Sequence, residues 1–229
     1  MPSKKTPSRK GRPAGPELPK ALVDLLNYLW PEGVIQMFQL QESAFWDLHP
    51  EIDRKLRGIK GVRVLFERAP EQPVESSEDP DDSVVLLLDE PVRSYYLYFL
   101  SPIRPEFHYH IDRTPAGQGD IGLVLALSLV APVAMMRSAR REVFEDGTTL
   151  DPDITGDSGL ASVTVPPGSE SVADSLIQSV TRIMEAAEIM VLPPALLQVP
   201  VDGLTADPDL ALEAPVTVRD AFFFSERCA

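Results

Sequence analysis

The apolar and polar positions of residues 81–112 predict strands of an antiparallel sheet. Three runs favour extended structure: the apolar Val84–Leu88, the aromatic and aliphatic Tyr95–Leu100, and the strictly alternating Glu106–Asp112. Prolines stand between the runs, where a missing backbone donor does little harm to a ladder of hydrogen bonds. We therefore expect the three runs to form the central meander of a sheet.

Three other segments predict helices. Glu17–Leu29 and Val172–Ile189 show the 3.6-residue period of an amphipathic helix, with apolar residues three or four positions apart. His49, Pro50 and Glu51 open a short helix that extends to Leu56. Gly61–Arg68 alternates instead, which predicts a strand. In sequence order, two of the predicted helices therefore precede the central strands and one follows them.

The apolar segment Ile121–Met136 is harder to assign. Leu123, Leu127 and Val130 form a helical stripe, although a buried strand also suits this composition. Pro132 must kink or end a helix at this point. We expect the segment to pack under the sheet.

The remaining apolar runs predict further strands, and the order of elements predicts the fold class. These runs are Val133–Phe144, Leu160–Val165, Leu196–Val201 and Val216–Phe224. Helices and strands do not alternate regularly, which favours an α+β fold, an antiparallel sheet flanked by helices, over a parallel doubly wound sheet. We expect residues 17–229 to form one such domain after a disordered basic tail, residues 1–16.

The tail and the rest of the chain carry opposite charge. Five of the 21 basic residues lie in residues 1–16, which contain no acid, so the other residues hold 16 bases against 35 acids, a net charge of −19. Such a body repels nucleic acid backbones and attracts basic protein partners, although acidity also serves solubility alone. No signal-peptide pattern and no apolar run of about 20 residues is present, so we expect a cytoplasmic protein without a membrane span.

The strongest local concentration of acid is the segment Ala69–Asp82, a loop broken by three prolines. We interpret it as a docking loop for a basic partner, with a solvated insertion as the alternative. Its acidic residues are Glu71, Glu75, Glu78, Asp79, Asp81 and Asp82.

Metal chemistry has one candidate in the sequence. On a strand, Glu106, His108, His110 and Asp112 would share one face, and two imidazoles with a carboxylate can bind zinc or iron. The alternative is a strand with a polar outer face, since the only other histidine is His49. We expect no metal and no other cofactor.

Two further motifs are incomplete. Residues 117–122 match GxGxxG, but Asp120 places a negative charge where a dinucleotide's pyrophosphate would bind, so a flexible turn is the alternative. Residues 151–156 match the start of a calcium loop, but Ser162 stands where a bidentate glutamate is required. The single cysteine, Cys228, has no positional partner that would mark it as a nucleophile.

The layout of the chain resembles that of the immunity proteins that neutralise bacterial polymorphic toxins. The resemblance is carried by a helix followed by LWPEG, the strands VVLLLDE, YYLYFLS and FHYHID, a late helix, and the closing VTVRDAFFFSE. It implies a non-catalytic protein that binds a toxin. The alternatives are a metal-dependent enzyme using His108 and His110, and a secretion chaperone or adaptor that holds a partner on the aromatic residues of the sheet. Aromatic residues of this kind are more often core and sheet surface than a binding platform, although tyrosines on an exposed face would make adhesive anchors. The residues concerned are Tyr95, Tyr96, Tyr98 and Phe99.

Overall fold

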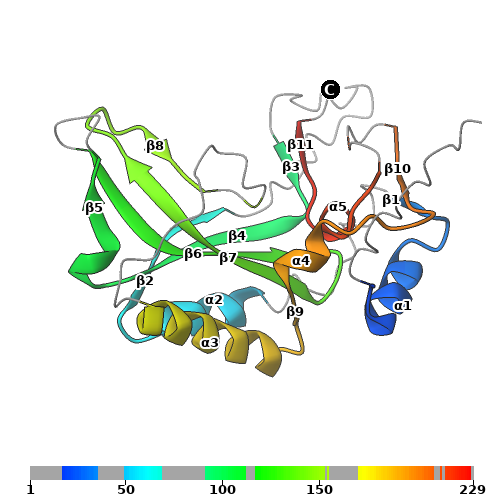
Figure 1. The fold of residues 1–229 in the computed structure, drawn as a ribbon, viewed down its shortest axis with the longest axis horizontal. Coiled ribbons are helices and arrows are strands. Elements are labelled where there is room, and N and C mark those ends of the chain that lie inside the picture. Colours follow the sequence, from blue (N-terminus) through cyan, green and yellow to red (C-terminus); the bar gives the residue numbers. More distant parts are fainter. Residues whose placement is uncertain are drawn as a thin grey trace, which may run out of the picture.

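The computed structural model describes residues 17–35, 49–68, 91–111, 117–152, 154, 170–208, 212 and 215–227 (Figure 1). Its helices are α1 (Lys20–Leu29), α2 (His49–Arg57), α3 (Glu170–Ala186), α4 (Pro194–Leu197) and α5 (Val218–Phe222), with a 3-10 turn, η3, over Pro105–Phe107. The strands are β1 (Val34–Ile35), β2 (Val62–Arg68), β3 (Pro91–Arg93), β4 (Tyr95–Pro102), β5 (His108–His110), β6 (Gln118–Ser128), β7 (Val133–Val143), β8 (Thr149–Leu150), β9 (Met190–Leu192), β10 (Thr205–Ala206) and β11 (Ser225–Arg227).

The main sheet is antiparallel along its central path. Its strands follow the order β2-β4-β6-β7-β8, with β5 also paired to β6 and with β9 paired in parallel to β7. Two small sheets pair β1 with β10 and β3 with β11. These pairings confirm the predicted α+β fold with an antiparallel strand meander flanked by helices.

The strands β4 and β5 are not neighbours, which differs from the expected order of the meander. Strand β6 has 11 residues and is long enough to pair with both of them. Its segment Leu123–Ser128 pairs with β4, and its segment Gln118–Asp120 pairs with β5. The long strand β6 is therefore the element that the sheet is arranged around.

Both faces of β4 are covered, which explains why its sequence is apolar without alternation. All eight of its residues are buried. Residues 95, 97 and 99 belong to a core shared with α1 and α5, whereas residues 96, 98 and 100 belong to a second core shared with α2 and α3. Figure 1 shows α2 and α3 together along one side of the sheet, with α1, α4 and α5 gathered towards one end of the molecule.

The three predicted helices are confirmed, with shifts of a few residues at their ends. The first begins at Lys20, the second extends to Arg57, and the third covers Glu170–Ala186. The predicted strand at residues 61–68 is confirmed as β2, and the one at residues 133–144 as β7.

The helical interpretation of Ile121–Met136 is wrong. The segment contains most of β6 and the start of β7, joined by a turn at residues 129–132. Eight consecutive residues from Ile121 to Ser128 are buried because both faces of β6 are covered, so the alternation that distinguishes a strand is lost. Pro132 lies in the turn, where it removes no ladder hydrogen bond.

Two predicted strands near the C-terminus contain short helices instead. Leu196–Val201 begins within α4, and Val216–Phe224 contains α5. Helix α5 starts at a capping box in which the side chains of Thr217 and Asp220 each accept a hydrogen bond from the other residue's backbone N–H. That local motif outweighs the β propensity of the surrounding residues.

Some predicted segments lie outside the described residues. These are the tail 1–16, the strands at 84–88 and 160–165, and the acidic loop at 69–82. Within the described part of the chain, no helix has the length and apolarity needed to cross a membrane.

Candidate functional site

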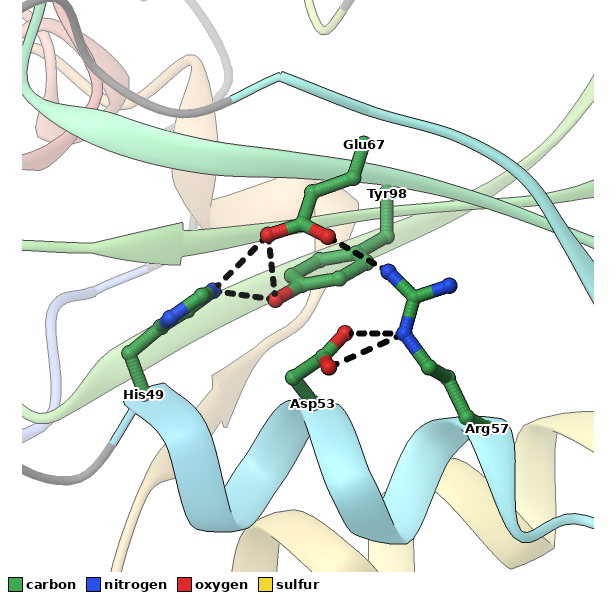
Figure 2. Close-up of polar contacts among 5 residues, drawn as sticks. All are labelled: His49, Asp53, Arg57, Glu67 and Tyr98. Atoms are coloured by element: carbon green, nitrogen blue, oxygen red, sulfur yellow. Dashed lines mark hydrogen bonds and ion pairs between the residues drawn. The ribbon is translucent and has the colours of Figure 1, made fainter.

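The most connected group of polar side chains lies where α2 meets the edge of the sheet (Figure 2). We call it the α2 cluster, and it consists of His49, Asp53, Arg57, Glu67 and Tyr98. The first three residues are four positions apart on α2 and therefore share one side of the helix. Glu67 on β2 and Tyr98 on β4 are partners in the strand ladder, so both project towards that side.

Arg57 joins the two carboxylates of the α2 cluster. Its Nε donates to both oxygens of Asp53, at 2.8 and 2.9 Å, and its Nη2 donates to Glu67 Oε2 at 2.6 Å. These contacts, led by the hydrogen bond to Asp53, raise the pKa of Arg57. The side chain of Arg57 is 49% exposed, so solvent screens these ion pairs and their net contribution to stability is modest.

His49, Tyr98 and Glu67 meet at the buried end of the α2 cluster. Tyr98 Oη contacts His49 Nε2 and donates to Glu67 Oε1 at 3.3 Å, and His49 Nε2 lies 3.2 Å from the same carboxylate oxygen. All three contacts are satisfied when His49 carries its proton on Nε2 and the hydroxyl of Tyr98 points to Glu67. The imidazole also stacks on Tyr96, with ring centroids 3.6 Å apart.

Burial decides the protonation of this group. It lowers the pKa of His49 and outweighs the attraction of Glu67, which acts in the opposite direction. Burial also raises the pKa of Tyr98. At neutral pH the three groups are therefore a neutral imidazole, a neutral phenol and a carboxylate that accepts their hydrogen bonds. This arrangement fastens α2 to β2 and β4.

The lowered pKa of His49 predicts a loss of stability in acid. The unfolded chain takes up a proton on this residue at a higher pH than the folded chain, so stability falls as the pH drops below the ordinary histidine value of 6.5. The slope from this one group is at most about 1.4 kcal/mol per pH unit. The measurement is urea unfolding between pH 7.5 and pH 5 for the wild type and for His49→Gln.

The free energy difference between wild type and His49→Gln should be larger at pH 7.5 than at pH 5. Subtracting the free energy of unfolding of the variant from that of the wild type at each pH removes the contribution of every other titrating group that the substitution leaves unchanged. A difference that grows in acid would mean that the attraction of Glu67 outweighs burial.

The α2 cluster was not predicted from the sequence. The spacing of His49, Asp53 and Arg57 is visible in the sequence and marks one polar side of a helix. Their partners on β2 and β4 become neighbours only through the register of those two strands.

The candidate metal ligands named from the sequence are only partly brought together. His108 and His110 are exposed on β5, but Glu106 lies in η3, so the prediction that it shares their strand face is wrong. Pro105 starts that 3-10 turn and interrupts the strand. Asp112 lies outside the described residues. Within those residues, no group of three or more His, Cys, Asp or Glu side chains is placed to hold a metal ion.

The GxGxxG segment is a strand and forms neither a dinucleotide loop nor a flexible turn. Gly119 and Gly122 lie inside β6, and no helix follows. A Cβ at Gly119 would meet the ring of Tyr109 at 2.0 Å, and one at Gly122 would meet the backbone oxygen of Leu100 at 2.3 Å. These glycines therefore make room for close packing.

The calcium-loop candidate and the aromatic residues of the sheet are used within the fold. Asp151 accepts hydrogen bonds from Arg68 at 2.6 Å and from Arg141 at 2.8 Å, whereas the other candidate ligands, at 153, 155 and 162, lie outside the described residues. The aromatic residues proposed as an exposed adhesive surface are buried, with exposed fractions between 0 and 8%. Tyr95, Tyr96, Tyr98 and Phe99 are therefore core residues, as favoured from the sequence, and the alternative of an exposed adhesive surface is wrong.

The predicted docking residues cannot be placed in this geometry. Glu71, Glu75, Glu78, Asp79, Asp81 and Asp82 lie outside the described residues, and so does Cys228.

A scan of protein-family models, a search of curated proteins and a search of solved structures each find no match to this chain.

Proposed function

We propose that this chain is a non-catalytic bacterial protein of the immunity type, which binds a basic toxin in the cytoplasm and neutralises it. The observation that carries the proposal is the charge of the chain outside residues 1–16, where 35 acids stand against 16 bases. A field of one sign speeds the encounter with a partner of the opposite sign and orients it. An acidic surface therefore suits a toxin whose active site is basic.

The geometry of the polar clusters supports a binding role over a catalytic one. Both carboxylate oxygens of Glu67 accept hydrogen bonds inside the α2 cluster, and Asp151 is shared by two arginines. Groups engaged in this way hold helices and strands in place. Exposed acids elsewhere, such as Asp24 on α1 and Glu185 on α3, are placed to contribute to the field at the surface.

The acidic loop remains the proposed contact with the toxin. It follows the last residue of β2 in the chain. A long, polar, proline-broken loop can adapt to a partner without disturbing the sheet. Charges at the rim of an interface act on the association rate more than on the dissociation rate.

The test is the association rate of the chain with a toxin encoded beside it, measured at low and at high salt. We expect a variant with the six loop acids changed to Gln or Asn to associate about tenfold more slowly at low salt. The difference should shrink to about twofold or less at 0.5 M salt, since the Debye length is then only about 4 Å.

A second variant with the same change in net charge serves as the matched control. It neutralises six exposed acids on the described part of the chain: Glu17, Asp24, Glu32, Asp174, Glu185 and Asp202. The loop is the contact if only the first variant is slowed strongly. Equal rates for the wild type and the loop variant at low salt would remove the loop from the mechanism, and the absence of any toxin binding would contradict the proposed function itself.

A metal-dependent enzyme using His108 and His110 remains the second candidate. The observation in its favour is that the Asp120 carboxylate lies 2.5 Å from His108 Nδ1. A chaperone or adaptor is less well supported, because the aromatic surface that it would use is buried.

A further inference from the structure

Two histidines share one side of the short strand β5. His108 and His110 are exposed, whereas Tyr109 between them is half-buried. Residues two apart on a strand lie on the same face, with their Cα atoms roughly 6–7 Å apart. Two imidazoles at this spacing can reach one metal ion. The side chains opposite them on β6 are Asp120 and Gln118.

Asp120 orients the ring of His108. Its Oδ1 lies 2.5 Å from His108 Nδ1, and Arg63 Nη2 donates to the same oxygen at 2.9 Å while lying 3.3 Å from His108 Nδ1. Because a carboxylate only accepts hydrogen bonds and Asp120 is the closer of the two contacts, we assign the proton of a neutral His108 to Nδ1, which leaves the lone pair on Nε2. That nitrogen lies on the far side of the ring from Asp120.

This is the arrangement found around histidines that bind metals in proteins. The ring nitrogen that does not bind the metal donates to a carboxylate, which fixes the tautomer and makes the other nitrogen a better ligand. The Asp120 side chain is 14% exposed and the His108 side chain 39% exposed, so the carboxylate is sheltered while the imidazole remains accessible. The positive charge of Arg63 is offset by its direct ion pair with Asp120.

We propose that His108 and His110 together bind a divalent transition metal ion, with Asp120 as the positioning residue for His108. Imidazole nitrogens prefer Cu²⁺, Ni²⁺ and Zn²⁺ to Mg²⁺ and Ca²⁺, which take oxygen ligands. Gln118 pairs with His110 across the ladder, and its amide oxygen is of a type that can serve as a further ligand. Two protein nitrogens leave the other positions of the ion to water, so the metal exchanges more readily than at a closed structural site.

This site goes beyond the proposed function, because metal binding requires no toxin. It reverses the expectation from the sequence that no metal binds, and it differs from the candidate weighed there, since the supporting carboxylate is Asp120 on β6 and not Glu106 or Asp112. The tautomer of His108 and the cross-strand position of Asp120 carry the inference.

The test is calorimetric titration of the full chain, without a histidine tag and freed of metal by a chelator, with CuCl₂, NiCl₂, ZnCl₂ and MgCl₂. We expect one equivalent of Cu²⁺, Ni²⁺ or Zn²⁺ to bind and no Mg²⁺ to bind. Asp120→Asn should weaken binding by about 10- to 100-fold, as for other carboxylates that orient metal-bound histidines. His108→Ala, His110→Ala and the double variant should each lose binding.

Two control variants address other ligands in the chain. His49→Gln and Cys228→Ser should both bind like the wild type. Electron paramagnetic resonance of the Cu²⁺ form of the wild type should show coupling to two imidazole nitrogens, a result that depends on no variant. The proposed site would be contradicted by any of three results: unchanged metal binding by the double variant, no binding of Cu²⁺, Ni²⁺ or Zn²⁺ to the wild type, or coupling of Cu²⁺ to fewer than two imidazoles. Full affinity in Asp120→Asn would overturn the positioning role.

Discussion

Replacing Phe222 by alanine is expected to lower the free energy of unfolding by about 3–5 kcal/mol. The side chain is 0% exposed and belongs to the core shared by α1, β4 and α5. Its ring lies near that of Phe223, with centroids 6.5 Å apart. The Phe222 backbone carbonyl accepts hydrogen bonds from Ser94 at 3.2 Å and Ser128 at 2.8 Å, which limit the collapse of the surrounding structure into the cavity.

Urea unfolding measures this loss, and Tyr28→Ala is its control. Tyr28 is also aromatic, but it is 81% exposed on α1, so its removal should change the free energy of unfolding by no more than about 0.5 kcal/mol. A loss below about 1 kcal/mol for Phe222→Ala would show that the C-terminal helix does not pack into the core as described.

The C-terminal segment shows what hydrophobic pattern alone leaves undecided. Phe222, Phe223 and Phe224 are all buried, with exposed fractions of at most 2%. A regular strand would send the middle ring to the opposite face. The chain instead leaves α5 at Phe222, and the change of direction lets three consecutive rings enter one core. The capping residues Thr217 and Asp220 are the feature of the sequence from which that helix could have been predicted.

The prediction was most accurate where one element face is solvated. The apolar period of α1 and the strand at β2 were found at the expected positions, although a β-bulge between Val64 and Phe66 interrupts the alternation of β2. Strand β6 could not be separated from a helix in the same way, because coverage on both faces removes its polar positions. The covering layers come from residues distant in sequence, which a local pattern does not contain.

The sequence alone reveals only some of the residues in each of the two polar sites, the β5 histidines and the α2 cluster. The histidines of β5 were identified from their spacing, but their carboxylate partner Asp120 depends on the pairing of β5 with β6. In the α2 cluster, the sequence shows the helical spacing of His49, Asp53 and Arg57. It does not show that Glu67 lies beside them. In both cases strand register supplies the missing neighbour.

Helix α3 provides a comparison between adjacent residues, in which Met184→Ala should cost more stability than Ile183→Ala. Leu176 and Val180 are buried, and Ile183 is partly buried against the same core. The next residue, Met184, is 0% exposed. The stripe therefore continues in steps of four from Leu176 through Val180 to Met184, with Ile183 at its edge.

Met184→Ala should lower the free energy of unfolding by about 2–5 kcal/mol, because it removes a fully buried side chain and leaves a cavity. Ile183→Ala should lower it by less than about 2 kcal/mol, since part of that side chain already contacts water. Met190→Ala is the matched control, as this methionine on β9 is 41% exposed and its loss should stay within about 0.5 kcal/mol. The free energies come from urea unfolding at one pH. A larger loss for Ile183→Ala than for Met184→Ala would mean that α3 is rotated about its axis relative to the sheet.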